Sequence, residues 1–150
     1  AAPDTGGTKR ANAYAKHLGC DMAICYKQRK VANKVDSMTV IGDVSGKDVV
    51  LVDDMVDTAG TLTKAADMMI AEGANSVRAV CTHPVLSGDA YERIEESAIT
   101  ELIVSDTIPL NKEKAEKSTK IKQVSVAPLF ADVIKRVSTH ESISSHFIIA

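Results

Sequence analysis

A run of four branched apolar residues at 49–52, Val-Val-Leu-Val, is the feature that most constrains the fold. Such a continuous run predicts a buried strand of the kind used by parallel sheets, because a half-exposed strand would alternate apolar and polar side chains. An acidic loop rich in small residues follows the run. Apolar residues then recur at helical spacing until Gly73, which indicates a helix that ends there. Strand, loop and helix in this order are typical of a sheet whose strands are joined by helices.

The same alternation continues along the rest of the chain. We expect helices over 8–18, 62–70, 89–96 and 129–137, and strands over 22–25, 37–42, 49–52, 77–82, 101–105 and 121–126. Residues 27–34 and 112–122 are charged and show no sustained period, which predicts exposed loops. The pattern therefore indicates a single α/β domain over 1–150, with an open, mostly parallel sheet flanked by helices.

The composition excludes several classes of partner. Formal net charge is −2, so the chain lacks the positive field that draws proteins to nucleic acid. No apolar run approaches the roughly 20 residues needed to cross a bilayer. The three cysteines have neither the count nor the spacing of a disulfide framework or a zinc site, which favours a reducing, cytoplasmic compartment. We therefore expect no nucleic-acid partner and no membrane.

The loop at 53–61 carries the strongest indication of chemistry. It comes directly after the best predicted strand and before a helix, where ligands collect in open α/β sheets. Small residues at 58–61 let backbone N–H groups approach an anion, and the helix N-terminus adds a favourable dipole. The hydroxyls of Thr58 and Thr61 can donate to the same anion. We interpret the loop as a phosphate site.

Three carboxylates in this loop extend the prediction. Asp53 and Asp54 come where the strand is expected to end, placed to accept from sugar hydroxyls or to organise a metal. Asp57 or Thr58 could instead cap the helix. Capping requires one such residue, not three carboxylates and a glycine, so we favour a functional interpretation.

Two further loops contain residues suited to phosphate chemistry. At 4–7 the sequence Asp-Thr-Gly-Gly precedes a helix; its glycines allow backbone conformations that expose N–H groups, and Asp4 can hold Mg²⁺. Lys27 and Arg29 are cations of the kind that neutralise a migrating phosphoryl group. Each loop also has a structural interpretation, since Gly-Gly before a helix and a solvated basic loop are both common. His83 follows a strand nearby and is interpreted as structural.

Taken together, these segments resemble one enzyme family. Residues 49–61 are similar to the signature of the type I phosphoribosyltransferase fold, in the form found in ribose-phosphate pyrophosphokinases. Residues 82–88, 106–110 and 142–147 are typical of the same family, and the resemblance covers essentially the whole chain. It implies a phosphoribosyltransferase-like sheet with a flexible catalytic loop that includes 27–29.

The resemblance implies a reaction and a set of site residues. Members of the family transfer the β,γ-diphosphoryl group of ATP to the anomeric hydroxyl of ribose 5-phosphate, release AMP and require Mg²⁺. By position, the resemblance assigns catalysis to Lys27 and Arg29, and Mg²⁺ binding to Asp4. It assigns the diphosphate loop to Asp4, Thr5, Gly6 and Gly7. It assigns the ribose 5-phosphate site to Arg29, Asp53, Asp54, Asp57, Thr58, Ala59, Gly60 and Thr61. It assigns a regulatory phosphate site to Ser142, Ser144 and Phe147.

The resemblance also implies a longer protein. Family members have two similar halves, and this chain resembles the second. We therefore expect a C-terminal domain without the N-terminal half that supplies much of the ATP site and a metal-linked histidine. We expect the chain to bind ribose 5-phosphate without turning over, and the full-length protein to be a homo-oligomer, a hexamer built from dimers. Two alternatives stay open: a phosphoribosyltransferase sharing the 53–61 loop, and a non-catalytic, synthetase-associated regulatory subunit.

Overall fold

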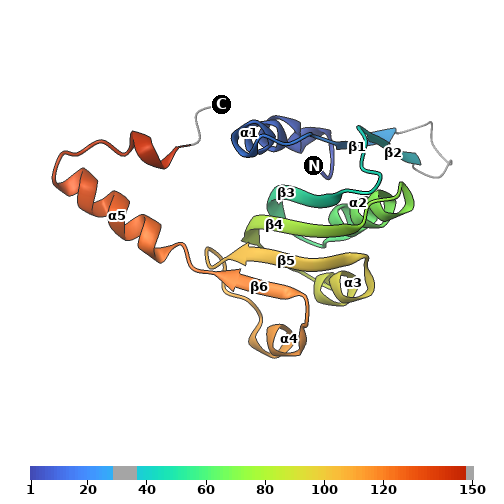
Figure 1. Cartoon of the computed structure of the whole chain (residues 1–150). Helices are drawn as coiled ribbons and strands as arrows, with labels where there is room; N and C mark the ends of the chain where they lie inside the picture. Colours follow the sequence, from blue (N-terminus) through green and yellow to red (C-terminus); the bar gives the residue numbers. More distant parts are fainter. Residues whose placement is uncertain (29–36, 148–150) are drawn as a thin grey trace.

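The computed structural model of the chain describes residues 1–28 and 37–147. Its centre is a parallel sheet in the order β3-β4-β5-β6. These strands are β3 (Asp48–Val56), β4 (Ser76–Pro84), β5 (Ile99–Ser105) and β6 (Ile121–Val124). Successive strands are joined by α2 (Gly60–Ala71), α3 (Ala90–Glu96) and α4 (Lys112–Lys117) (Figure 1). The arrangement confirms the expected α/β class.

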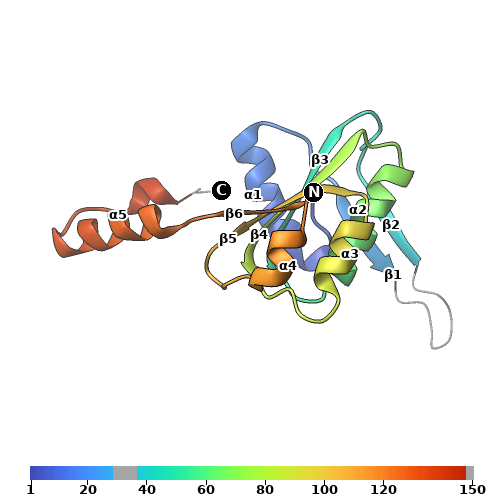
Figure 2. The same ribbon diagram turned by 90° about the horizontal axis from the view of Figure 1, so that it is seen from below.

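The helices cover the two faces of this sheet unequally. Strand order follows chain order and crossovers between parallel strands are right-handed, so the three connecting helices must fall on one face. Figure 2 shows α2, α3 and α4 on one side and α1 (Thr8–Leu18) on the other. Val50 lies on the α1 side, where 43% of its surface stays exposed. On the side of the connecting helices Val49 and Leu51 are both buried, whereas on the α1 side Val52 is buried and Val50 is not.

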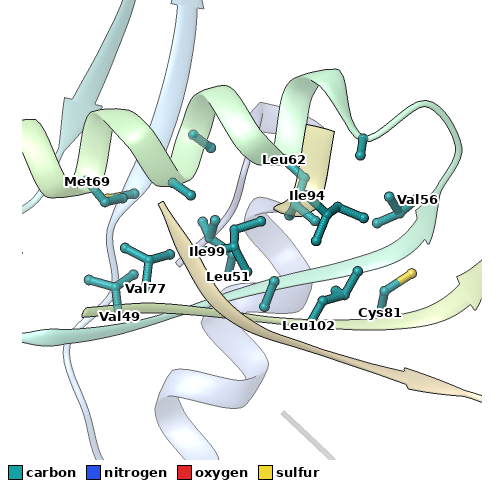
Figure 3. Close-up of a cluster of buried hydrophobic side chains, with 14 of the residues drawn as sticks. Val49, Leu51, Val56, Leu62, Met69, Val77, Cys81, Ile94, Ile99 and Leu102 are labelled. Carbon is teal, nitrogen blue, oxygen red and sulfur yellow. The ribbon is translucent and has the colours of Figure 1, made fainter. Parts of the chain in front are cut away.

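The hydrophobic core lies mainly between the sheet and the helices α2 and α3 (Figure 3). Leu51 of β3 and Leu102 of β5 are completely buried there, as are Met69 of α2 and Ile94 of α3. The helical repeat predicted from the sequence is confirmed, since α2 turns one apolar face to the core. That face consists of Leu62, Ala65, Ala66 and Met69.

An antiparallel hairpin lies beside the main sheet. It consists of β1 (Ile24–Gln28) and β2 (Ser37–Ile41). Ala1 and Ala2 join it to β3: the Val52 N–H donates to the Ala1 carbonyl at 3.0 Å, and the Cys25 N–H donates to the Ala2 carbonyl at 3.0 Å. Within the apolar run predicted as a strand over 22–25, the N–H of Ala2 donates to the Ala23 carbonyl at 3.0 Å, and the strand β1 itself begins at Ile24.

The prediction of an exposed loop over 112–122 is wrong. Asn111 starts α4 by accepting the N–H of Lys114 with its side chain at 3.1 Å. None of the six residues described for this helix is buried, and only Ala115 among them is apolar, so the segment has no apolar period to reveal it. The capping asparagine followed by Glu113 in the first turn is the signal that marks the helix. The chain returns to the core at Ile121.

The closing amphipathic helix is confirmed as α5 (Ala127–Ser138), which extends away from the sheet in both views (Figures 1 and 2). None of its residues, all of which are described, is buried. Its apolar side chains are largely exposed, with 57% of Phe130 and 66% of Ile134 open to solvent. Across the described ranges, no helix combines the length and apolar character needed to cross a membrane.

Candidate functional site

A cleft of about 440 Å³ lies where β3 leads into α2. Two segments far apart in the sequence line it. The first contributes Asp4, Gly6, Gly7 and Arg10, and the second contributes every residue from 53 to 62. The structure therefore brings the loop at 4–7 and the loop at 53–61, which were recognised separately in the sequence, into one cavity.

Asp53 and Asp54 lie inside β3 rather than in the loop predicted to begin at 53. The strand continues through Val56, with Met55 in register with His83 of β4. A hydrogen-bonded strand holds the two carboxylates more firmly than a loop would. The phosphate loop proper is therefore 57–61.

The phosphate loop turns from β3 into α2. Ala59 at its centre is buried and has a φ of 60°, in the left-handed region that non-glycine residues rarely adopt. Ala59 is also the N-cap position of α2, and an alanine offers no side-chain oxygen to the first N–H groups of the helix. Among the described residues no side chain caps α2, so Asp57 and Thr58 do not have the alternative capping role. An uncapped helix start can donate its free N–H groups to an anion.

The segment at 4–7 forms a 3-10 turn, Thr5–Gly7, that begins after Asp4. Oδ1 of Asp4 accepts the N–H of Gly7 at 3.2 Å. This N–H is therefore bonded within the protein, whereas the sequence predicted that it would be available to a ligand. Gly7 has an ordinary φ of −81°. A Cβ at Gly6 would lie 3.1 Å from the same Asp4 oxygen. The glycine at position 6 thus leaves room for the Asp4 carboxylate rather than supplying a left-handed backbone.

Arg10 is a functional candidate that the sequence did not reveal. Its guanidinium extends from α1 into the cleft and pairs with Asp54 at 2.6 Å and with Asp53 at 3.5 Å. In the sequence it is one of several cations on a helix and has no neighbour that marks it. Only the packing of α1 against β3 brings it to the two carboxylates.

The two neighbouring carboxylates differ in their ionisation. Burial raises the pKa of Asp53 to about 6, with the charges of Asp54 and Asp4 acting in the same direction against a hydrogen bond from the Asp54 N–H. Burial also acts to raise the pKa of Asp54. The charge of Arg10 and several hydrogen bonds outweigh this effect and hold the pKa of Asp54 below its usual range. Asp54 is therefore the ionised partner of Arg10, and Asp53 takes up a proton near pH 6.

The raised pKa of Asp53 predicts a pH-dependent stability. The folded protein binds this proton more tightly than the unfolded chain does, so the stabilisation is complete below about pH 4 and is lost as the pH rises through about 6. Asp53→Asn keeps an acceptor for the Asp54 N–H but cannot ionise. We expect it to raise the Tm at about pH 7.5 and to change it little at about pH 4. Calorimetric unfolding of both proteins at the two pH values measures this, and a difference independent of pH would contradict it.

Comparisons with known proteins give the family. The phosphoribosyl synthetase-associated domain family matches residues 26–148. The chain belongs to this family. It is 55% identical over 148 residues to a ribose-phosphate pyrophosphokinase of Wolinella succinogenes, covering 99% of this chain and 47% of that protein. It is also 55% identical over 145 residues to one from Porphyromonas gingivalis, covering 97% of this chain and 45% of that protein.

Similarity to a solved structure supports the same family as the sequence relatives. The chain is similar to the crystal structure of phosphoribosylpyrophosphate synthetase from Mycobacterium smegmatis, with a TM-score of 0.83 and 36% identity, over 93% of this chain and 44% of that one. This similarity confirms the phosphoribosyltransferase-like α/β fold expected from the sequence. The chain spans about half the length of the curated relatives it matches.

The cations assigned to catalysis by the family resemblance lie at the edge of the described structure. Lys27 belongs to β1, where its backbone is in register with Met38 of β2. The exposed loop predicted over 27–34 is thus partly strand, because β1 continues through Gln28. Arg29 and the rest of the predicted flexible catalytic loop lie outside the described residues.

The residues assigned to a regulatory phosphate site lie beyond α5, away from the sheet (Figure 1). The hydroxyls of Ser142 and Ser144 are 2.9 Å apart, and 64% of Phe147 is exposed. The structure does not bring these residues to the cleft. His83 does not line the cleft either; its Nδ1 lies 3.0 Å from the hydroxyl of Thr107, a contact between the ends of β4 and β5.

Proposed function

We propose that the chain is the ribose 5-phosphate-binding half of a ribose-phosphate diphosphokinase and corresponds to the C-terminal half of its longer relatives. The whole enzyme transfers the β,γ-diphosphoryl group of ATP to the anomeric hydroxyl of ribose 5-phosphate and releases AMP. The observation that carries the proposal is that the loops at 4–7 and 57–61 share one cleft with Asp53 and Asp54. The relatives named as ribose-phosphate pyrophosphokinases support it over a phosphoribosyltransferase.

The cleft suggests how the sugar phosphate would be held. The N–H groups of 57–61 and the hydroxyls of Thr58 and Thr61 would bind the 5-phosphate. Asp53 and Asp54 would accept hydrogen bonds from the ribose hydroxyls. With its 5-phosphate fixed at one end, the sugar would direct its anomeric hydroxyl toward the loop at 4–7, which would receive the diphosphate. Catalysis would then rest on positioning and charge neutralisation, with no covalent intermediate.

The residues present fit Mg²⁺ held jointly with the substrates. Within residues 1–28 and 37–147, no group of three or more His, Cys, Asp or Glu side chains could hold a metal ion by itself. Protein-bound Mg²⁺ is usually held by one or two carboxylates together with phosphate oxygens and water. Asp4 in the cleft would supply such a carboxylate. When bound, Mg²⁺ would neutralise phosphate charge, and Lys27 and Arg29 would add positive charge to the transferring group.

Titration calorimetry of ribose 5-phosphate into this chain, with and without Mg²⁺, tests the sugar-phosphate site. We expect saturable binding, and its loss in Asp57→Ala because the loop loses the side chain that anchors its first residue. Asp21→Ala is the matched control, since Asp21 is exposed and pairs with Lys47 away from the loop. Absence of binding by the unaltered chain, or undiminished binding by Asp57→Ala, would contradict the proposal.

If the chain is only the ribose 5-phosphate-binding half, it should not catalyse the reaction by itself. With only part of the ATP site, the purified chain should release no AMP from ATP and ribose 5-phosphate. Detectable AMP release would refute the view that this is an inactive half. For the full-length protein we propose a cytoplasmic homo-oligomer, a hexamer, and sedimentation of that protein measures its assembly.

A non-catalytic, synthetase-associated regulatory subunit is the second candidate, and the description of the matching family favours it. Asp4, Lys27 and Arg29 are all present, however, which supports a catalytic protein. Substitution of Lys27 by alanine in the full-length protein separates the two candidates. The enzyme should lose several orders of magnitude in rate while still folding, whereas a regulatory subunit has no activity to lose.

A further inference from the structure

The turn that follows β4 lies against the phosphate loop at 57–61. This turn belongs to the segment at 82–88, whose distinctive sequence the proposed function leaves without a role. The N–H of Leu86 donates to the carbonyl of Val56 at 3.1 Å, and the N–H of Ser87 donates to the carbonyl of Asp57 at 3.1 Å. These two bonds continue the contact between β3 and β4 beyond the strands and into the loop.

Two side chains from the same region complete the contact. The Ser87 hydroxyl donates to Oδ1 of Asp57. Nη1 of Arg93, on α3, donates to the carbonyl of Thr58 at 3.0 Å. A Cβ built on Gly60 would lie 3.9 Å from the same Arg93 nitrogen, so the guanidinium also lies beside the start of α2.

These contacts fix the direction of successive peptide groups. The carbonyls of Val56, Asp57 and Thr58 are all bonded to the region after β4. In a planar trans peptide the N–H of the next residue points away from the carbonyl. The N–H groups that follow these three carbonyls therefore point away from α3 and its preceding turn. Consecutive N–H groups directed the same way form a concave anion site.

The left-handed backbone of Ala59 requires the loop to be held in place by neighbouring groups. A non-glycine residue at a φ of 60° is strained and persists only where its surroundings hold it. The peptide before Ala59 is the one that Arg93 holds through the Thr58 carbonyl. Arg93 also faces Asp89, but at 3.9 Å and with both side chains substantially exposed, so that pair is the weaker restraint.

We propose that Arg93 is a positioning residue for phosphate binding, and that it acts through the Thr58 carbonyl to aim the loop N–H groups at the ligand. Ser87 shares this role at Asp57. The inference rests on the proposed function for the ligand, but the orientation of the loop can be measured without any ligand. It gives the segment after β4 a part in the site although Ser87 and Arg93 do not line the cleft.

Three variants of the 150-residue chain test the role of Arg93. Arg93→Met keeps the apolar stem and the helix preference but removes the donor. We expect it to weaken ribose 5-phosphate binding about tenfold, the loss typical of one hydrogen bond from a charged group. Arg93→Lys can still donate and should restore affinity to within about threefold. Asp89→Asn, the matched control, removes the other partner of Arg93 and should change affinity less than twofold, since an exposed pair contributes little.

A ligand-free measurement separates this inference from the proposed function. NMR order parameters for 58–60 should fall in Arg93→Met and recover in Arg93→Lys. Unchanged order parameters would overturn the inference, even if the unaltered chain fails to bind ribose 5-phosphate and so refutes the proposed function. Equal affinity of Arg93→Met and the unaltered chain, or an equal loss in Asp89→Asn, would also overturn it.

Discussion

Replacing Leu51 by alanine should lower the free energy of unfolding by about 3 kcal/mol, within the roughly 2–5 kcal/mol measured for buried leucines. Leu51 is completely buried in β3 and belongs to the core cluster drawn in Figure 3. The truncation removes apolar contacts with the helix side of the sheet and leaves a cavity. Ladder bonds to β4 hold the backbone of β3 in place, so the cavity cannot close by moving the strand.

Val50→Ala is the control for this prediction. Val50 is the neighbouring residue on the same strand, but its side chain lies on the α1 face and is 43% exposed. Its truncation should cost less than about 1 kcal/mol, because it removes less buried surface and opens no closed cavity. Urea unfolding of both variants measures the difference. Equal losses would contradict the difference in burial between Leu51 and Val50.

The sequence predicted the elements whose apolar residues face the core. The runs that became β3, β4 and β5 are apolar because their side chains pack under α2 and α3, so periodicity and burial have the same origin. Gly19 ends α1 with a φ of 64°, as its position after an apolar helix indicated. The sequence did not predict α4, because five of its six residues are Lys or Glu and a helix with a single apolar residue, Ala115, has no apolar period to detect.

The end of β3 shows a different limit. Aspartates disfavour strands, so a loop was predicted from Asp53 onward. In the structure, pairing with β4 extends β3 to Val56 and overrides that local preference. A register fixed by a neighbouring strand cannot be deduced from the residues of one strand alone.

The candidate site likewise contains residues that the sequence could reveal and residues that it could not. The loop at 53–61 could be recognised because three carboxylates and a glycine exceed what capping a helix requires. The loop at 4–7 has a common structural interpretation and was assigned through the family resemblance. Arg10 and Arg93 could not, because each lies on a helix where an arginine is ordinarily solvated. Their roles arise from packing, which places Arg10 against Asp54 and Arg93 against the Thr58 carbonyl.

Gly60→Ala should weaken ribose 5-phosphate binding without lowering the Tm. A methyl group at this position would meet nothing closer than 3.9 Å, so the fold can accept it. Alanine is also preferred over glycine in helices by about 0.5–1 kcal/mol, so the Tm should stay level or rise. The proposed phosphate, however, requires the backbone at the start of α2 to come within hydrogen-bonding distance. Gly60 lines the cleft, and the methyl group would lie 3.9 Å from the hydroxyl of Thr58, which is proposed to bind the phosphate, so it would crowd that approach.

The expected loss of affinity for ribose 5-phosphate in Gly60→Ala is at least about 100-fold, the equivalent of two hydrogen bonds to a charged group. Asp21→Ala is the control, since Asp21 is exposed and pairs with Lys47 away from the cleft. It should therefore leave affinity within about threefold. Calorimetric titration and thermal unfolding of both variants give the two readouts. A Gly60→Ala protein that binds normally would show that the phosphate does not approach the start of α2, while one that fails to fold would show that glycine is needed there for structure rather than for the ligand.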